Sequence, residues 1–451
     1  MQQITNHLPT AELQALDAAH HMHPFSTQSD LAKVGARVIT SASGVRLKDS
    51  EGQEILDAMA GLWCVNIGYG REELAQVAAR QIRELPYYNT FFQTTHVPAI
   101  ALSAKLAELA PGDLNHVFYA GSGSEANDTN LRMVRTYWEQ MGKPGKSIVI
   151  SRWNAYHGSS VGSGSLGGMK GIHSQGGLPI PGIEHIDQPH WWAEGGDLSP
   201  EEFGLERARQ LEAKIDQLGE DRVAAFIAEP VQGAGGVIIA PDTYWPEVMR
   251  ICRERDILFI ADEVMTGWGR TGTLLACEQA DVVPDILCLS KGLTGGAMPL
   301  AVTMASEPIW DAHYSTDRTR TFYHSSSYTA NPLACAAAVA NLAIWREEPV
   351  RERVATLAEM QQTHLDALSG HAMVRNARRC GTIAALELGD PAGSYLSELG
   401  PRLLRRFREA DLLLRPLGNT VYVMPPYCIE DEDLARIWAE IGAAADDLAT
   451  Q

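Results

Sequence analysis

The sequence DILFIADEV at residues 256–264 decides the fold, because a short apolar run here leads directly into two acidic residues. An apolar run of this length, bounded by polar residues, is typical of a buried strand. Similar runs lie at 116–120, 147–151, 223–230 and 285–290, and helical patterns separate them, for example at 124–143 and 244–255. This alternation predicts an α/β fold, with a mainly parallel sheet and helices on both of its faces.

The two ends of the chain have a different pattern. Beyond residue 330, an alanine-rich helical stretch is followed by charged helical patterns near 347–370 and 396–410 and by a strand-like run at 412–426. Residues 36–52, near the N-terminus, have the pattern of a small hairpin sheet. We therefore expect a large domain at 66–330 and a smaller α+β domain built from both ends, residues 1–65 and 331–451.

Composition excludes several classes of partner. With 37 Lys and Arg against 56 Asp and Glu, the chain of 451 residues carries a net charge of −19, which argues against nucleic acid or an anionic membrane as partner. No run approaches the roughly 18 apolar residues of a membrane helix, and the N-terminus lacks the pattern of a signal peptide. Seven cysteines without a C-x-x-C pair indicate a reducing compartment and no zinc site. We expect a cytoplasmic protein without a bound metal.

Three features follow strands of the predicted sheet. GSGSEAND at 121–128 is a glycine-rich turn that opens a helix, which suits a phosphate, although alone it also fits the dinucleotide-binding fingerprint. Asp262 ends a buried strand, where a carboxylate needs a cation or a strong donor. Lys291 follows another strand, where it can become a nucleophilic amine. Together they favour pyridoxal phosphate, which needs a lysine for its Schiff base, a carboxylate for its ring nitrogen and a helix N-terminus for its phosphate.

Four motifs of the chain resemble the class III aminotransferases of the type I pyridoxal-phosphate fold: LSKGLTGG at 289–296, ADEVMTGWGRTG at 261–272, GSGSEAND and RWNAYHG at 152–158. The resemblance covers nearly the whole chain and implies that residues 66–330 are the cofactor-binding domain. It assigns two catalytic residues, Lys291 as the lysine bonded to the cofactor and Asp262 as the partner of its ring nitrogen. It further implies cofactor contacts from Ser122, Gly123, Ser124, Tyr156, His157, Glu229, Val264 and, across a homodimer interface, Ser326 or Ser327.

Two subfamilies share the resemblance. Up to about residue 260, motifs such as DAMAGLWCVNIGYG at 57–70 look like ω-transaminases, which pass amino groups from amines or polyamines to pyruvate. From about 264, motifs such as LLRPLGNTVYVMPPY at 413–427 look more like diaminopelargonate synthase of biotin synthesis. This difference suggests a chimera with a junction between Glu229 and Cys288. The resemblance implies a largely apolar substrate site, with Arg415 and Glu229 as a switchable pair, formed by Phe25, Leu62, Trp63, Phe91, Phe92, Tyr156, Ala234 and Arg415.

We therefore expect a two-step transfer of an amino group from a hydrophobic amine, diamine or ω-amino compound to pyruvate or a similar keto acid. Diaminopelargonate synthase is the alternative within the family, which also contains an aminomutase and a decarboxylase. A nicotinamide dehydrogenase would need an acid after the strand at 147–151, where Arg152 stands, and would leave Asp262 and Lys291 unexplained. A non-catalytic binding protein is a further alternative. The sequence does not identify the physiological amine.

Overall fold

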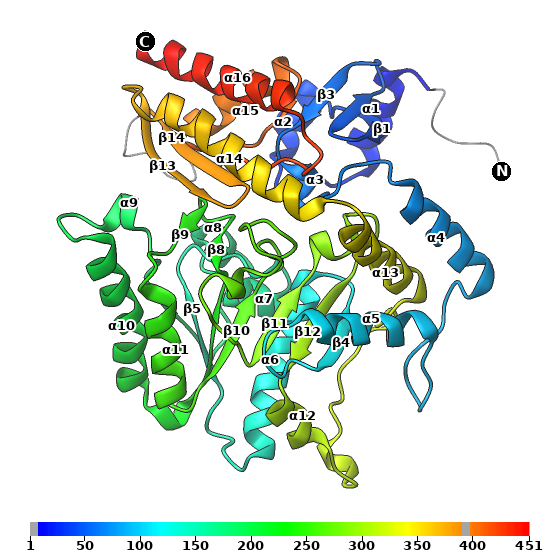
Figure 1. Cartoon of the computed structure of the whole chain (residues 1–451), viewed down its shortest axis with the longest axis vertical. Coiled ribbons are helices and arrows are strands. Elements are labelled where there is room, and N and C mark those ends of the chain that lie inside the picture. Colours follow the sequence, from blue (N-terminus) through cyan, green and yellow to red (C-terminus); the bar gives the residue numbers. More distant parts are fainter. Residues whose placement is uncertain (1–7, 390–396, 451) are drawn as a thin grey trace.

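The computed structural model describes residues 8–389 and 397–450. Seven strands form its central sheet in the order β4-β12-β11-β10-β7-β5-β6 (Figure 1). β12 runs antiparallel to β4 and β11, and all the other pairings in this sheet are parallel, so the predicted mainly parallel sheet is confirmed. The strands are β4 (His116–Ala120), β5 (Ile148–Arg152), β6 (Ile183–Ile186), β7 (Val223–Ala228), β10 (Leu258–Asp262), β11 (Ile286–Leu289) and β12 (Ala301–Ala305).

Helices bury both faces of this sheet, and the alternation within β10 shows which residues face which layer. Leu258 and Ile260 pack in the cluster that includes α6 (Gly123–Gln140), α7 (Val161–Leu166) and α12 (Glu307–His313). Phe259 and Ala261 pack in the large cluster on the other face. That face is covered by α5 (Val97–Leu109), α10 (Pro200–Leu218), α11 (Tyr244–Glu254) and α13 (Pro332–Glu347). Because side chains alternate along a strand, Asp262 projects toward the α6 layer.

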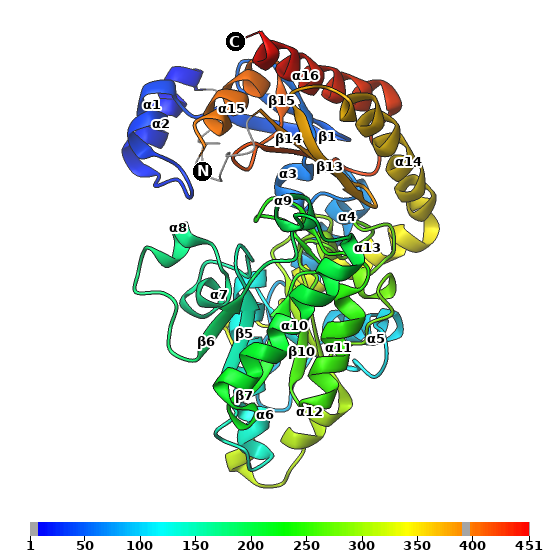
Figure 2. The same ribbon diagram turned by 90° about the vertical axis from the view of Figure 1, so that its left-hand side faces the viewer.

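Two small sheets lie beyond the carboxyl ends of the central strands (Figures 1 and 2). One combines the two ends of the chain: β1 (Ile39–Ser43), β2 (Arg46–Asp49), β3 (Glu54–Asp57) and β15 (Leu412–Leu413). The other contains β13 (Val374–Cys380), β14 (Ile383–Leu388) and β16 (Thr420–Val423). The run 412–426, expected to be strand-like throughout, instead forms β15 and β16 in different sheets. Backbone hydrogen bonds between Leu417 and Thr420 close a tight turn there, in which Gly418 has a positive φ of 66°.

Most of the remaining helices belong to the two ends of the described chain. Near the C-terminus they are α14 (Val350–Ser369), α15 (Leu399–Glu409) and α16 (Asp431–Ala449). Near the N-terminus they are α1 (Thr10–His20), α2 (Gln28–Val34), α3 (Ala60–Trp63) and α4 (Glu72–Glu84). The short elements α8 (Lys170–His173), α9 (Trp191–Glu194), β8 (Val231–Gln232) and β9 (Ile238–Ile239) lie in connections of the central part. Within the described ranges, no helix has the length and apolar character needed to cross a bilayer.

Candidate active site

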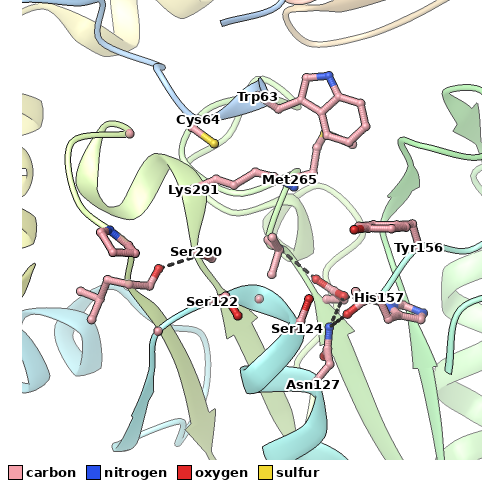
Figure 3. Close-up of a pocket in the computed structure, with 18 of the residues that line it drawn as sticks. Trp63, Cys64, Ser122, Ser124, Asn127, Tyr156, His157, Met265, Ser290 and Lys291 are labelled. Atoms are coloured by element: carbon pink, nitrogen blue, oxygen red, sulfur yellow. Dashed lines mark hydrogen bonds and ion pairs between the residues drawn. The ribbon is translucent and has the colours of Figure 1, made fainter. Parts of the chain in front are cut away.

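A cavity of about 340 Å³ lies at the carboxyl edge of the central sheet (Figure 3). The ends of β4, β7, β10 and β11 meet there because these strands are mutually parallel. The cavity brings together ten of the residues predicted from the sequence: Trp63, Ser122, Gly123, Ser124, Tyr156, His157, Glu229, Asp262, Val264 and Lys291. The three features expected to share one sheet edge, the glycine-rich turn, the acid and the lysine, therefore do share it.

Asp262 is 3 % exposed and ends β10, and hydrogen-bond donors surround its carboxylate. Its Oδ2 atom accepts from Nδ2 of Asn127 at 2.7 Å and lies 2.7 Å from Nδ1 of His157. Its Oδ1 atom accepts from the backbone N–H of Val264 at 3.1 Å. A buried carboxylate at this position needs hydrogen-bond donors. Here α6, the loop after β5 and the backbone two residues beyond Asp262 supply them. They provide hydrogen-bond partners for both oxygens of this buried carboxylate.

Lys291 lies two residues beyond the end of β11, at the first position of a 3₁₀ turn, η3 (Lys291–Thr294). Its φ of 45° is in the left-handed region, a costly conformation for a residue with a side chain. Asn341 holds the turn by donating from Nδ2 to the carbonyl oxygens of Gly292, at 2.8 Å, and Leu293, at 3.0 Å. This fixed turn directs the lysine side chain into the cavity (Figure 3).

Burial lowers the pKa of the Lys291 amine below its ordinary value of 10.5, although the charges of Cys64, Asp262 and Glu229 act in the opposite direction. Within the described residues, the amine forms no ion pair shorter than 4 Å, and its Nζ atom lies 5.0 Å from the centre of the Trp63 ring. A larger fraction of neutral amine is therefore available at Lys291 than at a solvent-exposed lysine.

The N-terminus of α6 forms the floor of the cavity. Ser122 is the N-cap, and its hydroxyl accepts from the backbone N–H of Glu125 at 3.2 Å. The amides of Gly123 and Ser124 have no hydrogen-bond partner among the described residues. A Cβ atom at Gly123 would lie 3.1 Å from both γ-carbons of Val264, so glycine allows the helix to approach this side chain closely. Free amides and the positive end of the helix dipole suit an anion here.

Glu229 follows β7 and is 5 % exposed. Its Oε1 atom accepts from the backbone N–H of Tyr156 at 2.9 Å, and its Oε2 atom accepts from that of Gly233 at 3.2 Å. Burial raises the pKa of this carboxyl group. Arg152, which is 1 % exposed, donates to the backbone carbonyl of Glu229. Glu229 therefore fixes the backbone on both sides of the cavity and places Tyr156 at its rim (Figure 3).

The opposite wall is a strained segment that carries Trp63. Asp57 accepts from the backbone N–H groups of Met59, at 2.9 Å, and Gly61, at 2.6 Å, and from the hydroxyl of Tyr69, at 2.8 Å. Gly61 and Trp63 have positive φ values of 68° and 66°. The Trp63 indole donates to the hydroxyl of Tyr422 at 3.0 Å. These bonds hold the aromatic ring over the cavity.

Eight predicted residues do not line this cavity: Phe25, Leu62, Phe91, Phe92, Ala234, Ser326, Ser327 and Arg415. Phe25, Leu62 and Phe92 are exposed by 69 %, 55 % and 89 %, so a single chain provides no cup around them. Ala234 is buried instead in the apolar cluster that contains Trp63. Ser327 is exposed, and its carbonyl accepts from the Tyr87 hydroxyl at 2.9 Å.

The cavity also contains residues that sequence reasoning did not identify, among them Cys64, Asn127, Met265 and Ser290. Asn127 stands within the motif GSGSEAND, four residues after Gly123, so it lies one turn into α6 and faces the sheet. That helical spacing is a signal that could have identified it. Cys64 and Met265 follow Trp63 and Val264 directly, but their direction depends on the local backbone.

Pyridoxal phosphate fits this arrangement. One cavity contains amides without partners at a helix N-terminus, a buried carboxylate surrounded by hydrogen-bond donors, and a lysine with a lowered pKa. Its volume is within the range of cofactor sites.

Outside the cavity, ligand atoms of Asp17, His21 and His23 lie within 4.8 Å of one another. Both imidazoles are within hydrogen-bond distance of the Asp17 carboxylate, which accounts for their convergence without a metal ion.

Comparisons with known proteins agree with this fit. A family model described as aminotransferase class-III matches residues 29–444. The putrescine–pyruvate aminotransferase of Pseudomonas aeruginosa is 50 % identical over 441 residues, which cover 96 % of each chain. The diaminobutyrate–2-oxoglutarate transaminase of Halomonas elongata is 38 % identical over 91 % of this chain and 90 % of its own.

Solved structures are similar over the same length. The omega transaminase of Pseudomonas jessenii in complex with PMP matches with a TM-score of 0.94 and 35 % identity, over 97 % of this chain and 98 % of that one. An (S)-enantioselective omega-transaminase from Thermomicrobium roseum matches with a TM-score of 0.94 and 37 % identity, over 98 % and 99 %. These similarities run through nearly the entire chain, and they give no support to a junction between two parent sequences.

Proposed function

The chain belongs to the class III aminotransferases, which use pyridoxal phosphate, and we propose that it is an ω-transaminase that moves an amino group from an aliphatic or hydrophobic amine or diamine to pyruvate. The observation that carries this proposal is that Lys291 and Asp262 line the same cavity, together with the N-terminus of α6. An amine of lowered pKa and a buried carboxylate at one site are the groups that amino transfer requires.

When bound, pyridoxal phosphate supplies a carbonyl that condenses with amines and a ring that accepts electrons from the substrate carbon. We assign the phosphate to the amides of Gly123 and Ser124 and to the hydroxyls of Ser122 and Ser124. Asp262 would accept a hydrogen bond from the protonated ring nitrogen. Tyr156 and Val264 would enclose the ring from its two sides, and His157 and Glu229 would keep Asp262 and Tyr156 in place.

Lys291 has two tasks in this scheme. Its amine would hold the cofactor covalently, and once a substrate amine takes its place, the freed Lys291 amine would move a proton away from the substrate carbon. Burial favours the neutral amine that this transfer needs. The Trp63 ring lies 5.0 Å from Nζ and would stabilise the ammonium group that forms when the proton arrives.

The amine donor is inferred from the relative at 50 % identity, whose name gives putrescine as donor and pyruvate as acceptor. That similarity supports the ω-transaminase interpretation over diaminopelargonate synthase. The walls formed by Trp63, Met265 and Tyr156 suit an alkyl or aryl chain. We assign Arg415 to the carboxylate of the acceptor, which an arginine binds with a two-point fork, and Glu229 to the alternative state in which the substrate carries no carboxylate.

We further propose a homodimer. Phe92, Tyr328 and Ser327 are exposed in the single chain, and the Tyr87 hydroxyl ties the backbone of Ser327 to the segment that carries Phe92. A second copy of the chain would cover these aromatic residues, complete the substrate cup and place Ser326 or Ser327 at the phosphate. Seven cysteines, none of them in a disulfide, support a location in the cytoplasm.

Alanine formation tests the proposed function. The loaded protein is supplied with pyruvate and with putrescine, 1-phenylethylamine or S-adenosylmethionine in separate reactions, with Lys291→Ala as the inactive control. We expect alanine from the first two donors. No alanine from putrescine and 1-phenylethylamine, alanine from S-adenosylmethionine alone, or equal alanine formation by the control would contradict the assignment. The matched variants Ser326→Ala and Ser327→Ala identify the hydroxyl at the phosphate, because only one of them should weaken cofactor binding.

A further inference from the structure

A row of polar side chains crosses the central sheet beneath Asp262. The strand register pairs Asp262 with Cys288 and Cys288 with Thr303 across β10, β11 and β12. Residues in register project to the same face of a sheet, so all three side chains face α6. On α6, Asn127 and Asn130 are three residues apart and lie on the helix face that covers this row. Two asparagines and a threonine are therefore enclosed with Asp262 in one layer.

These side chains form a continuous chain of hydrogen bonds. The Thr303 hydroxyl donates to Oδ1 of Asn130 at 2.6 Å, and Nδ2 of Asn130 donates to Oδ1 of Asn127 at 2.9 Å. Nδ2 of Asn127 donates to Oδ2 of Asp262 at 2.7 Å and to the carbonyl of His157 at 2.8 Å. Thr303, Asn130 and Asn127 are at most 1 % exposed, so no solvent competes for these bonds.

The two acceptors at the Asp262 end of this series fix the direction of every hydrogen bond in it. The Asp262 carboxylate and the His157 carbonyl both accept, so the amide nitrogen of Asn127 must point to them. Its oxygen then faces Asn130, which must offer its own nitrogen. The oxygen of Asn130 consequently faces Thr303, which is left as the donor. If the side-chain amide of Asn127 or Asn130 were rotated by half a turn, two acceptor oxygens would be in contact. The hydrogen bonds can therefore run in one direction only, from Thr303 to Asp262.

We propose that Thr303, Asn130 and Asn127 are positioning residues for the reaction, forming a relay of hydrogen-bond donors that ends on the Asp262 carboxylate and holds a proton on the ring nitrogen of the cofactor. The inference rests on the proposed function, because it takes Asp262 as the partner of that nitrogen. Donors to a carboxylate make it a weaker base, so the proton between the carboxylate and the ring stays with the ring. An electron-poor ring is the state that accepts electrons from the substrate carbon.

The charged and titratable groups around Asp262 do not replace this relay. His157 shares the Oδ2 atom with Asn127. Glu229, Lys291 and the buried thiol of Cys288 also act on the site, and each interacts with the charge of Asp262. Of these, Glu229 and Cys288 add negative charge when ionised, and Lys291 would be bonded to the cofactor. Asn127 is a neutral donor, so its contribution does not depend on pH.

Nitrogen-15 NMR of protein loaded with pyridoxal phosphate labelled at the ring nitrogen tests the relay directly. The matched pair is Thr303→Val, which removes the hydroxyl at similar volume, and Thr303→Ser, which keeps it. Asn127→Leu removes the last donor. We expect the wild type and Thr303→Ser to give the shift of a protonated ring nitrogen. Asn127→Leu should lower the ratio of protonated to unprotonated nitrogen by about tenfold, with a smaller change in the same direction for Thr303→Val.

The outcomes separate the relay from the proposed function. A wild-type signal at the unprotonated position, or no bound cofactor, would overturn the assignment of Asp262 itself. A protonated wild type with an unchanged shift in Asn127→Leu and Thr303→Val would overturn the relay alone. Since Asn127→Leu removes a buried polar side chain and can fail to fold, Thr303→Val keeps the test decisive. Thermal unfolding of the Val and Ser variants separates an effect on the ring nitrogen from a general loss of stability.

Discussion

The close approach of α6 to Val264 predicts that Gly123→Ala weakens cofactor binding. The added Cβ atom would lie 3.1 Å from both γ-carbons of Val264, so the first turn of the helix or the valine must move by a few tenths of an ångström. Overpacking of this kind costs about 1–3 kcal/mol. The same turn carries the two unpartnered amides that we assign to the phosphate, so the dissociation constant of pyridoxal phosphate should rise by about 5- to 150-fold.

Titration of the apoprotein with pyridoxal phosphate, followed by tryptophan fluorescence, measures this effect. Val264→Ala supplies the matched background, because it removes the two carbons that the new methyl group would meet. In that background Gly123→Ala should change the dissociation constant by less than about twofold, which gives a coupling energy of about 1–3 kcal/mol. Normal binding by Gly123→Ala alone, or the same loss in both backgrounds, would refute the proposed steric origin.

Two further predictions concern the pH dependence and the backbone of the site. Because the Lys291 pKa is lowered in the folded state, the folded apoprotein binds fewer protons than the unfolded chain at alkaline pH. Its free energy of unfolding should therefore rise with pH up to about 10.5. Denaturant titrations of Lys291→Met should lack this part of the rise, and an identical slope would contradict the lowered pKa. Gly158→Ala should lower the free energy of unfolding by more than about 3 kcal/mol, because its Cβ would lie 2.3 Å from the Ser163 hydroxyl and 2.7 Å from Cα of Ser124. Gly171→Ala, which meets nothing within 4 Å, is its control, and equal melting temperatures for the two variants would contradict the steric argument.

The sequence was sufficient to predict the central sheet and the groups at its edge, because both depend on local patterns. Apolar runs that end in Asp262 and precede Lys291 specify strand ends, and the parallel topology brings strand ends to one edge. The glycine-rich turn, Asp262 and Lys291 together favoured pyridoxal phosphate, and the resemblance to a known family indicated the same cofactor. The hydrogen-bonded row was not predictable, since Asn130 and Thr303 meet only through the register of β12 and the rotation of α6.

The outer part of the substrate site was also beyond local patterns. Phe25 and Phe92 are aromatic residues in segments with positive φ values, and both are exposed in the single chain. Whether such residues face a substrate depends on the surface that covers them, which a second copy of the chain would provide. The run 412–426 shows the same limit on a smaller scale, because a turn closed by Leu417 and Thr420 divides an apparently continuous strand.

The visible absorption of the cofactor-loaded protein during a half-reaction tests the central claim most directly. An amine without a carboxylate, such as putrescine, is added in the absence of any keto acid, and pyruvate is added afterwards. Amino transfer through Lys291 predicts that the yellow band of the bound cofactor disappears with the amine and returns with pyruvate, and that Lys291→Ala shows no such cycle. A band that the amine leaves unchanged, or that pyruvate does not restore, would contradict an ω-transaminase.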